Sequence, residues 1–377
     1  MKEIKFNVPL SITASIANVN KFLRSKKPLH GPGENIFSIK KELKKIFGFK
    51  DTYLTNSCTS ALEICALALG LKKNDEVLLP SFSFITTASS FARTGCKIKY
   101  LDIEKETLMP SFDNIKKNIT KKTKAIIILH YQGYSINYLD KLQKLCRTKK
   151  IFLIEDAAQA FGSFFKNKPL GSFGDFACFS FHETKNIHAG TGGLLVVNNK
   201  KYINKINYIF DKGTNRSLML SKKIKYYSWV EIGSAFLMTE FSASYLLPQI
   251  KNYKKIVKKR SQLYYSYVRN LKFLNNKKIF LTNNYKYKYN FHSFVIILKS
   301  NVRESFLKYL KINKINAVIG YTPLHKSRFG KKYFLKQKKL VNTDRYVGSI
   351  VRLPFHNNLT IKSTNYISNK IKEYFKH

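Results

Sequence analysis

Residues 151–160, "IFLIEDAAQA", join a continuous apolar run to an acidic side chain at the end of that run. A short run of this kind, bounded by a helix-start signal, predicts a strand that is buried on both faces of a parallel sheet. Similar runs are "DEVLLP" (75–80), "KIKYLDI" (97–103), "KAIIILH" (124–130) and "FACFSFH" (176–182). Residues 57–71 and 137–150, which lie between them, have helical apolar spacing. The alternation predicts an α/β fold with a mostly parallel sheet flanked by helices.

The amino-acid composition and the pattern of the chain change near residue 250. Lys-, Asn- and Tyr-rich helical segments follow, together with one further strand, "HSFVIIL" (292–298). A length of 377 residues suits a large domain with a smaller companion. We therefore expect a large domain over 1–250, which includes an N-terminal arm over 1–30, and a smaller α+β domain over 251–377.

The chain is strongly basic, with 68 Lys and Arg against 22 Asp and Glu and a formal net charge of +46. The basic residues are mostly Lys, occur as singles and pairs along the whole chain, and accompany abundant Asn, Ile, Tyr and Phe. Because a nucleic-acid footprint is clustered and rich in Arg, drift in base composition explains this charge better than a specific nucleic-acid partner.

The cysteines, histidines and apolar runs of the sequence predict the cellular compartment and whether a metal is bound. The 5 cysteines show no CxxC spacing and the 8 histidines no HExxH, so neither a disulfide framework nor a metal site is predicted. No apolar run is long enough to span a membrane, and the N-terminus lacks the apolar core of a signal peptide. We expect a cytoplasmic protein without membrane insertion.

Asp156 ends the strand quoted first, and Gln159 follows three residues later. A buried carboxylate costs free energy unless it meets a cation, so Asp156 is a candidate ligand for a positively charged group. The alternative is a helix N-cap, because the following "AAQA" is a good helix start.

Two further segments have the composition of a phosphate and ring site. "LTNSCTSALE" (54–63) places small hydroxyl residues at a helix start, where free N–H groups bind phosphate; capping by Ser57 or Thr59 is the alternative. In "LPSFSFITTAS" (79–89), one of Phe82 and Phe84 is expected in the core, and the other is placed to cover a flat ring.

Lys185 lies in "FSFHETKNIHAGTGG" (179–193), five residues after Ser180. In a chain this rich in lysine, a single lysine is ordinarily a solvated surface residue. Together with a strand-end carboxylate, a helix start and an aromatic side chain, however, it completes the set that a pyridine-ring cofactor needs. The amine forms an imine with such a cofactor, and the carboxylate keeps the ring nitrogen protonated.

The order "NSCTSAL", "PSFSF", "EDAAQ", "FSFHETKN" and "GG" resembles the DegT/DnrJ/EryC1/StrS family of sugar aminotransferases. Members of that family use pyridoxal 5′-phosphate (PLP) on a type I aminotransferase fold. Within the family, the resemblance is strongest to the dTDP-4-amino-4,6-dideoxygalactose transaminases of enterobacterial common antigen synthesis. The segments that carry this second resemblance are "SFHETKN", "KGTNRS" (212–217), "IGSAFLM" (232–238), "YTPLH" (321–325) and "RLPFHNNL" (352–359).

The resemblance implies a role for each matching residue. Lys185 would hold PLP and shuttle protons, and Asp156 would pair with the ring nitrogen. Gln159 would bond the 3-oxygen of the ring, and Phe84 would stack on it. The phosphate would be bound by Ser180, Thr59 and Ser60. His182 neighbours the site, but a packed strand-end histidine is an equally good interpretation. Substrate contacts would come from Lys212, Arg216, Tyr321 and His325.

One departure concerns the contact between subunits. Many family members have an asparagine in a "G-x-N" segment that reaches the partner's phosphate, and Ala235 stands at that position here. Ser234 is the candidate substitute. The resemblance still implies a homodimer with active sites at its interface.

The implied reaction transfers the amino group of L-glutamate to C4 of dTDP-4-dehydro-6-deoxy-D-glucose. The products are dTDP-4-amino-4,6-dideoxy-D-galactose and 2-oxoglutarate. The alternatives are another nucleotide-linked keto sugar or, from a different class, a basic nucleic-acid-binding or non-catalytic PLP-binding protein. Family dehydratases that carry histidine in place of the lysine are disfavoured, because Lys185 is present.

Overall fold

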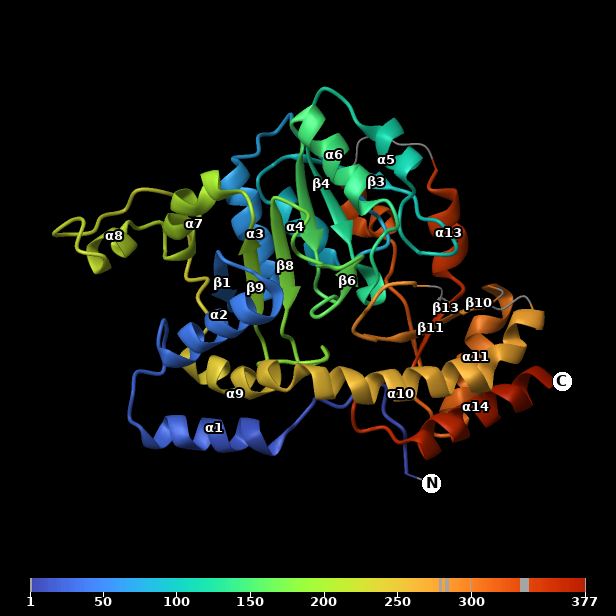
Figure 1. Ribbon diagram of the computed structural model, residues 1–377. Helices are drawn as coiled ribbons and strands as arrows, with labels where there is room; N and C mark the ends of the chain where they lie inside the picture. The colour runs from blue at the N-terminus through green and yellow to red at the C-terminus, as the bar shows by residue number, and fades with distance from the viewer. Residues whose placement is uncertain (1, 278–279, 282–284, 299, 333–338, 377) are drawn as a thin grey trace.

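A seven-stranded sheet forms the centre of the molecule in the computed structural model, which describes residues 2–277, 280–281, 285–298, 300–332 and 339–376 (Figure 1). The strand order is β1-β9-β8-β5-β4-β2-β3. The strands are β1 (Thr52–Thr55), β2 (Glu76–Pro80), β3 (Lys97–Leu101), β4 (Thr123–Leu129), β5 (Phe152–Asp156), β8 (Phe176–Ser180) and β9 (Gly193–Val197). Only β9 runs against its neighbours, and the other strands of this sheet are parallel to one another.

Helices cover both faces of this sheet, which explains why its strands are almost wholly apolar. One face packs against α3 (Cys58–Leu69), α4 (Ile85–Ala92) and α7 (Ile203–Phe210). The other face packs against α2 (Glu34–Phe47), α5 (Phe112–Asn118), α6 (Leu139–Lys149), α9 (Glu240–Lys251) and α10 (Tyr253–Leu271). The functional residues predicted at strand ends are therefore carried on a rigid frame.

The start of α3 is held close to the end of β9. Ser57 caps the helix, because its side chain accepts a hydrogen bond from the N–H of Ser60. A Cβ atom at Gly193 would lie only 2.4 Å from the carbonyl carbon of Ser57 and 2.5 Å from the N atom of Cys58. Glycine at the first position of β9 thus lets the helix start approach the sheet.

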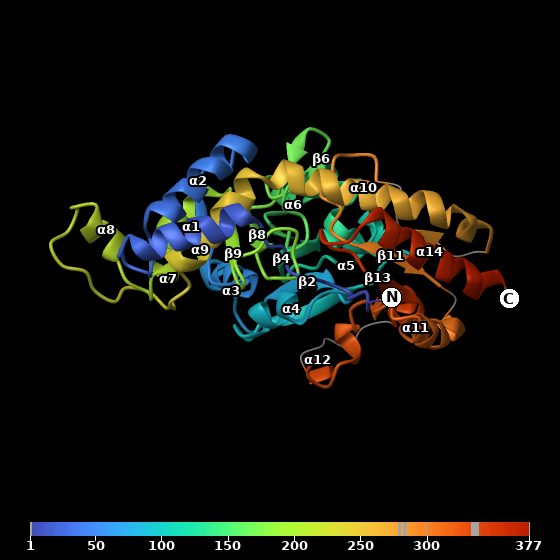
Figure 2. The ribbon, with the colours of Figure 1, turned by 90° about the horizontal axis from the view of Figure 1, so that it is seen from below.

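A second sheet of four strands forms the smaller part of the protein, in the order β10-β11-β13-β12. Its strands are β10 (Phe280–Leu281), β11 (Phe294–Ile297), β12 (Val318–Ile319) and β13 (Ile350–Leu353), all paired antiparallel. The helices here are α11 (Arg303–Ile312), α12 (Arg328–Lys332), α13 (Val341–Val347) and α14 (Ile361–Lys376). In both views α14 lies beside α10 (Figures 1 and 2).

Two N-terminal segments pack on different parts of the molecule. Residues 4–6 bond to the smaller part, since Ile4 pairs with Ile315 and the carbonyl of Phe6 accepts the N–H of Phe355. Helix α1 (Thr13–Arg24) lies along α9, and α8 (Arg216–Leu220) projects from the side of the molecule that is far from the smaller part (Figure 2). A short hairpin of β6 (Phe164–Phe165) and β7 (Lys168–Pro169) completes the named elements outside 3-10 turns.

The observed elements agree with the expected alternation of strands and helices. Each expected strand and helix occurs within about three residues of its predicted bounds. Sequence patterns did not predict β1 or β9. The expected domain change at residue 250 falls next to the junction of α9 and α10 at Asn252, and the division there stays a prediction.

Within the described part of the chain, no helix has both the length and the apolar character needed to cross a membrane.

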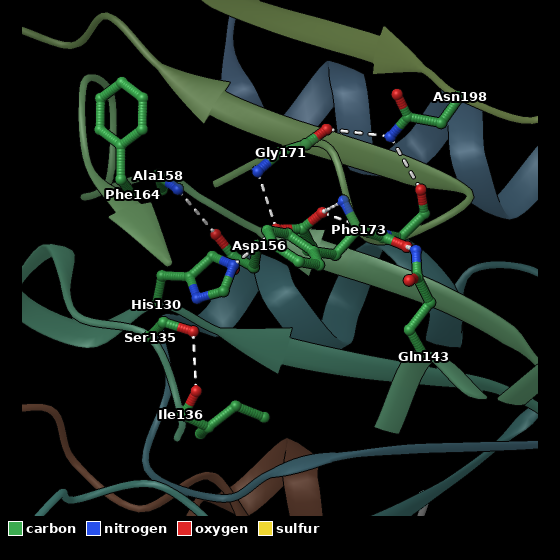
Figure 3. Close-up of polar contacts among 12 residues, drawn as sticks. His130, Ser135, Ile136, Gln143, Asp156, Ala158, Phe164, Gly171, Phe173 and Asn198 are labelled. Atoms are coloured by element: carbon green, nitrogen blue, oxygen red, sulfur yellow. Dashed lines mark hydrogen bonds and ion pairs between the residues drawn. The ribbon is translucent and has the colours of Figure 1, made fainter. Parts of the chain in front are cut away.

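A buried carboxylate holds the loop between β7 and β8, and Figure 3 labels three of its partners, His130, Gly171 and Phe173. Glu155 accepts hydrogen bonds from the N–H groups of Gly171, Phe173 and Gly174, each at 2.7 Å, and from Nε2 of His130 at 2.9 Å. Burial by itself raises the pKa of Glu155, but these donors outweigh burial and hold the pKa below its ordinary value. Glu155 therefore stays ionised in the core.

Replacing Glu155 with glutamine should lower the free energy of unfolding by about 3 kcal/mol, because an amide cannot satisfy four donors. A carboxylate whose pKa is lowered on folding contributes stability above its unfolded pKa and loses it as the pH falls through the folded value. The wild-type advantage over Glu155→Gln should thus shrink below about pH 4. Urea denaturation across pH measures both effects. Exposed Glu106→Gln is the control, and an equal loss in the two variants would contradict the assignment.

Candidate active site

The predicted site residues converge on a cavity at the carboxyl ends of β5 and β8. Its volume is about 380 Å³, and the small sheet closes it from the opposite side. Seven predicted residues line it: Thr59, Phe84, Asp156, Gln159, Ser180, Lys185 and Tyr321. The structure therefore places the amine of position 185 and the carboxylate of position 156 in one cavity.

Asp156 is buried at the last position of β5, with 2% of its surface exposed. Its Oδ2 accepts a hydrogen bond from the Thr87 hydroxyl at 2.6 Å, and its Oδ1 accepts one from the Ala158 N–H at 3.2 Å. Figure 3 shows the second of these bonds. Among the described residues no cation forms an ion pair with it, and burial raises its pKa despite these donors. The carboxyl is thus oriented toward a partner that the folded chain does not itself supply.

Lys185 follows a tight turn after β8 and lines the same cavity. Burial lowers the pKa of its amine to about 8, with the positive charge of Arg352 acting in the same direction. The described residues supply no hydrogen-bond or ion-pair partner for the Lys185 amine. A lysine with this pKa is a far better nucleophile near neutral pH than an ordinary surface lysine.

Gln159 presents its amide nitrogen to the cavity. The N–H of Gln132 donates to Oε1 at 2.7 Å, which sets the orientation of the amide, and Nε2 donates to the hydroxyl of Tyr321 at 2.5 Å. Phe84 stands at the cavity wall with 51% of its surface exposed, whereas Phe82 is fully buried. Phe82 is therefore the core residue of the two, and the ring-covering role of Phe84 stays a prediction.

The start of α3 offers free backbone donors. The N–H groups of Cys58 and Thr59 bond to no other described residue, as expected of the first turn of a helix. The N–H of Ser60 is taken by the Ser57 cap at 3.0 Å, and the Ser60 hydroxyl bonds to Asn56. Ser180 lies across the cavity at the end of β8. Ser57 therefore caps the helix while the N–H groups of Cys58 and Thr59 stay available for an anion.

Lys212 and Arg216 are not in this cavity. They line a second cavity of about 390 Å³, together with Ala235, between α2, α7 and the segment that leads to α9. Both cations lie near Asp211, with N–O distances of 3.0 and 3.7 Å. Ser234, beside Ala235, is exposed, and its carbonyl accepts the N–H of Lys212. Within one chain, these residues do not reach Lys185.

His325 bonds to large-domain and small-domain groups and does not line the Lys185 cavity. Its Nδ1 lies 2.7 Å from the Ser81 hydroxyl and its Nε2 lies 3.0 Å from Asp344. Tyr321, from the same segment, does line the cavity. The structure thus separates two residues that the sequence analysis grouped together.

Several cavity residues were not singled out from the sequence, among them Thr87, Arg352 and His292. Thr87 lies in the quoted segment 79–89, Arg352 opens "RLPFHNNL", and His292 opens "HSFVIIL". The signal was present for Arg352, because a basic residue interrupts the apolar run "SIVRLPF" (349–355) there. Nothing in the sequence indicates that these side chains, from α4, β13 and the loop before β11, share one cavity.

Known proteins with related sequences decide the family. The sequence profile of the DegT/DnrJ/EryC1/StrS aminotransferase family matches residues 11–372. The chain belongs to this family. The expected enzyme class, a PLP-dependent sugar aminotransferase, is therefore confirmed, and so is the expected cofactor.

Relatives within the family are named for different nucleotide sugars. GDP-perosamine synthase of Escherichia coli O157:H7 is 29% identical over 84% of this chain and 84% of its own length. UDP-4-amino-4,6-dideoxy-N-acetyl-beta-L-altrosamine transaminase of Campylobacter jejuni is 26% identical over 90% of this chain and 89% of its own. The PLP form of Spr1654 from Streptococcus pneumoniae superposes with a TM-score of 0.86 at 22% identity, covering 98% of this chain and 99% of that one. The type I fold is therefore confirmed.

The cavity of this family member suits PLP on its own chemistry. It contains a buried carboxyl without a cation, an amine with a lowered pKa and two free N–H groups at a helix start. A protonated pyridine nitrogen, an aldehyde and a phosphate need these three features respectively.

Proposed function

We propose that this aminotransferase moves the amino group of L-glutamate to C4 of dTDP-4-dehydro-6-deoxy-D-glucose. The products are dTDP-4-amino-4,6-dideoxy-D-galactose and 2-oxoglutarate, as in pathways of the enterobacterial common antigen type. The observation that carries the proposal is that Lys185 and Asp156 line one cavity. Burial raises the pKa of Asp156 and lowers the pKa of Lys185, so it favours the neutral form of each group.

Each residue has a defined task in this proposal. PLP, when bound, supplies an aldehyde that takes up the amino group and a ring that withdraws electrons. Asp156, oriented by Thr87 and Ala158, holds a proton on the ring nitrogen. Gln159 donates its free N–H to the 3-oxygen of the ring, and Phe84 covers the ring face.

Phosphate binding and proton transfer are assigned to residues other than those that contact the cofactor ring. Thr59 and Ser180 bind the phosphate through the helix start and a hydroxyl; Ser60 supports the capped turn and contributes less directly. Lys185 holds the cofactor and, once displaced as a neutral amine, takes a proton from the substrate carbon and returns it. A pKa near 8 makes that neutral amine accessible at physiological pH.

The sugar is argued from the segments shared with the subgroup and from the relatives. One relative is named for a 4-amino-4,6-dideoxy sugar linked to UDP, and the other for a GDP-linked sugar. Both relatives thus support amino transfer to a nucleotide-linked keto sugar, but their names give different nucleotides. The dTDP sugar rests on "KGTNRS" and "RLPFHNNL" in particular. Tyr321, which lies beside Gln159 in the same cavity, would contact that sugar.

A homodimer would bring Lys212, Arg216 and Ser234 to the partner's cavity. Exposed apolar side chains surround this region, among them Leu220 at 60%, Trp229 at 80% and Ile232 at 67% exposure. Large exposed apolar side chains in one area are typical of a protein interface. We therefore assign the two cations to the diphosphate of a substrate bound in the other subunit. The role of His325 stays a prediction, since Ser81 and Asp344 occupy both its ring nitrogens.

The first prediction concerns the capture of PLP by cofactor-free enzyme. Because only the neutral amine reacts, the capture rate should rise with pH and level off above the Lys185 pKa of about 8. Stopped-flow absorbance records the bound chromophore. Lys185→Ala should show no such signal at any pH and no transamination, whereas exposed Lys200→Ala should match wild type. Normal turnover by purified Lys185→Ala would overturn the assignment.

The substrate is tested with a panel of dTDP-, UDP- and GDP-linked keto sugars. With L-glutamate as donor, the dTDP-linked 4-keto-6-deoxyglucose should give the highest kcat/KM, and mass spectrometry with NMR should identify a 4-amino, galactose-configured product. A higher kcat/KM with a UDP or GDP sugar, or with a 3-keto isomer, would replace the proposed substrate but not the reaction class.

The shared site is tested by mixing two inactive variants. Lys185→Ala lacks the reacting amine, and Arg216→Ala weakens the diphosphate contact. If Arg216 serves the partner subunit, a mixed dimer contains one intact site, and mixing after mild dissociation should restore activity. Each variant mixed with itself is the control. A mixture as inactive as its components would show that Arg216 acts in its own subunit, and full activity of Arg216→Ala by itself would show that it does not act at all.

A further inference from the structure

His292 is a buried histidine that lines the Lys185 cavity from the loop before β11, with 5% of its surface exposed. Its Nδ1 lies 3.1 Å from Oδ1 of Asn186, the residue that directly follows Lys185 in the chain. Among the described residues nothing bonds to its Nε2. One ring nitrogen is therefore tied to the segment that carries the reacting amine, and the other is left for a ligand.

The contact with Asn186 fixes which ring nitrogen carries the proton. Nδ2 of Asn186 donates to the carbonyl of Asn290 at 2.7 Å, so the amide oxygen is the atom that faces His292. Turning the amide round would set two oxygens against each other at Asn290. Nδ1 of His292 must therefore donate, and in a neutral imidazole Nε2 is then an acceptor with a lone pair.

The surroundings of His292 keep the imidazole neutral. Burial, together with the positive charges of Lys185, Arg352 and Arg260, holds the pKa of His292 well below its ordinary value. Nε2 therefore accepts hydrogen bonds and does not donate them. Carboxylate and phosphate oxygens are acceptors as well, so an anionic group of a substrate is unsuited to this position.

Arg260 holds the loop that carries His292. From α10, its Nε donates to the carbonyl of Phe291 at 2.8 Å, and one terminal nitrogen donates to the carbonyl of His292 at 2.7 Å. Ser293, the next residue, also lines the cavity, and its buried hydroxyl has no partner in the described part of the chain. The loop is thus fixed from behind, and its side chains have unused hydrogen-bonding capacity at the cavity.

The chemistry of the two proposed substrates decides which of them suits His292. Besides its reacting amine, L-glutamate carries two carboxylates, and neither can donate to Nε2. A 4-keto-6-deoxy sugar carries hydroxyl groups, which do donate. The hydroxyl on C3 is the one next to the carbonyl carbon, because C5 on the other side bears only the methyl group. Since His292 contacts the residue beside Lys185, a group next to the reacting carbon is the one at hand.

We infer that Nε2 of His292 accepts a hydrogen bond from the C3 hydroxyl of the keto sugar, and so selects substrates with a hydroxyl beside the carbonyl carbon. This inference rests on the proposed function for the 4-keto sugar as amino acceptor. It assigns His292 to the sugar half-reaction alone. A sugar without that hydroxyl leaves a buried acceptor unpaired, and this costs free energy.

Asparagine and glutamine separate the two ring nitrogens of His292. The amide of asparagine ends near the position of Nδ1 and keeps a donor for Asn186, whereas the amide of glutamine reaches the position of Nε2. His292→Asn should therefore raise KM for the dTDP-linked 4-keto-6-deoxyglucose by about 3- to 10-fold, and His292→Gln should stay within about 2-fold of wild type. The reaction of either holoenzyme with L-glutamate, followed by absorbance, should be unchanged.

A substrate analogue without the hydroxyl completes a double cycle with the variant. On the 3,6-dideoxy-4-keto sugar, wild type should lose about 3- to 10-fold in kcat/KM, whereas His292→Asn should treat analogue and parent sugar alike. NMR of isotopically labelled holoenzyme gives a readout that does not depend on activity. The ring-nitrogen shifts of His292 should report a neutral imidazole that is protonated on Nδ1.

Four results would overturn this inference and leave the proposed function standing. Wild-type KM for the parent sugar in His292→Asn would show that Nε2 makes no contact with the sugar. Equal losses on the analogue in wild type and His292→Asn would show that the hydroxyl binds elsewhere. Unchanged kinetics of His292→Asn with impaired His292→Gln would show that His292 only holds Asn186. A proton on Nε2 would remove the acceptor. A wild type that does not aminate the 4-keto sugar would overturn the proposed substrate as well.

Discussion

The candidate site depends on a carboxyl group that is buried at the end of a parallel strand without a cation of its own. In water Asp156 would be ionised at neutral pH, but burial raises its pKa and so makes the ionised form costly. The bonds from Thr87 and Ala158 keep the group oriented and partly offset that cost. A protonated ring nitrogen is the kind of partner that removes the cost, so cofactor binding and the charge state of Asp156 are coupled.

The surrounding structure keeps this carboxyl in place. Glu155, the preceding residue in β5, points to the other side of the strand, as neighbours in a strand do, and ties the loop before β8 to β5. Lys185 lies beyond β8, the strand that this loop leads into. Two adjacent acidic residues therefore have different tasks. Glu155 is fully satisfied by its neighbours, and Asp156 is left with capacity for a ligand.

The cavity is built from two parts of the chain that are far apart in sequence. The large sheet contributes the carboxyl, the amine and the helix start, all close to strand ends. The small sheet contributes Arg352, and the loop before β11 contributes His292. The N-terminal residues 4–6 cross between these parts and place Phe6 against Arg352. Arg352 of the smaller part and the Lys185 amine of the larger part therefore face the same cavity.

The sequence by itself determined the parallel α/β architecture and the family, and it named most of the polar residues that the strand ends of the large sheet contribute to the cavity. Buried parallel strands have a strong local signature, and Asp156, Gln159, Ser180 and Lys185 directly follow or end such strands, where the chain is constrained by its immediate neighbours. Only the tertiary structure decided that Thr87 orients Asp156, that Arg352 and Phe6 reach the cavity, and that Lys212 and Arg216 do not. Those relations depend on how distant segments pack, and no local spacing encodes the distance between side chains on different sheets.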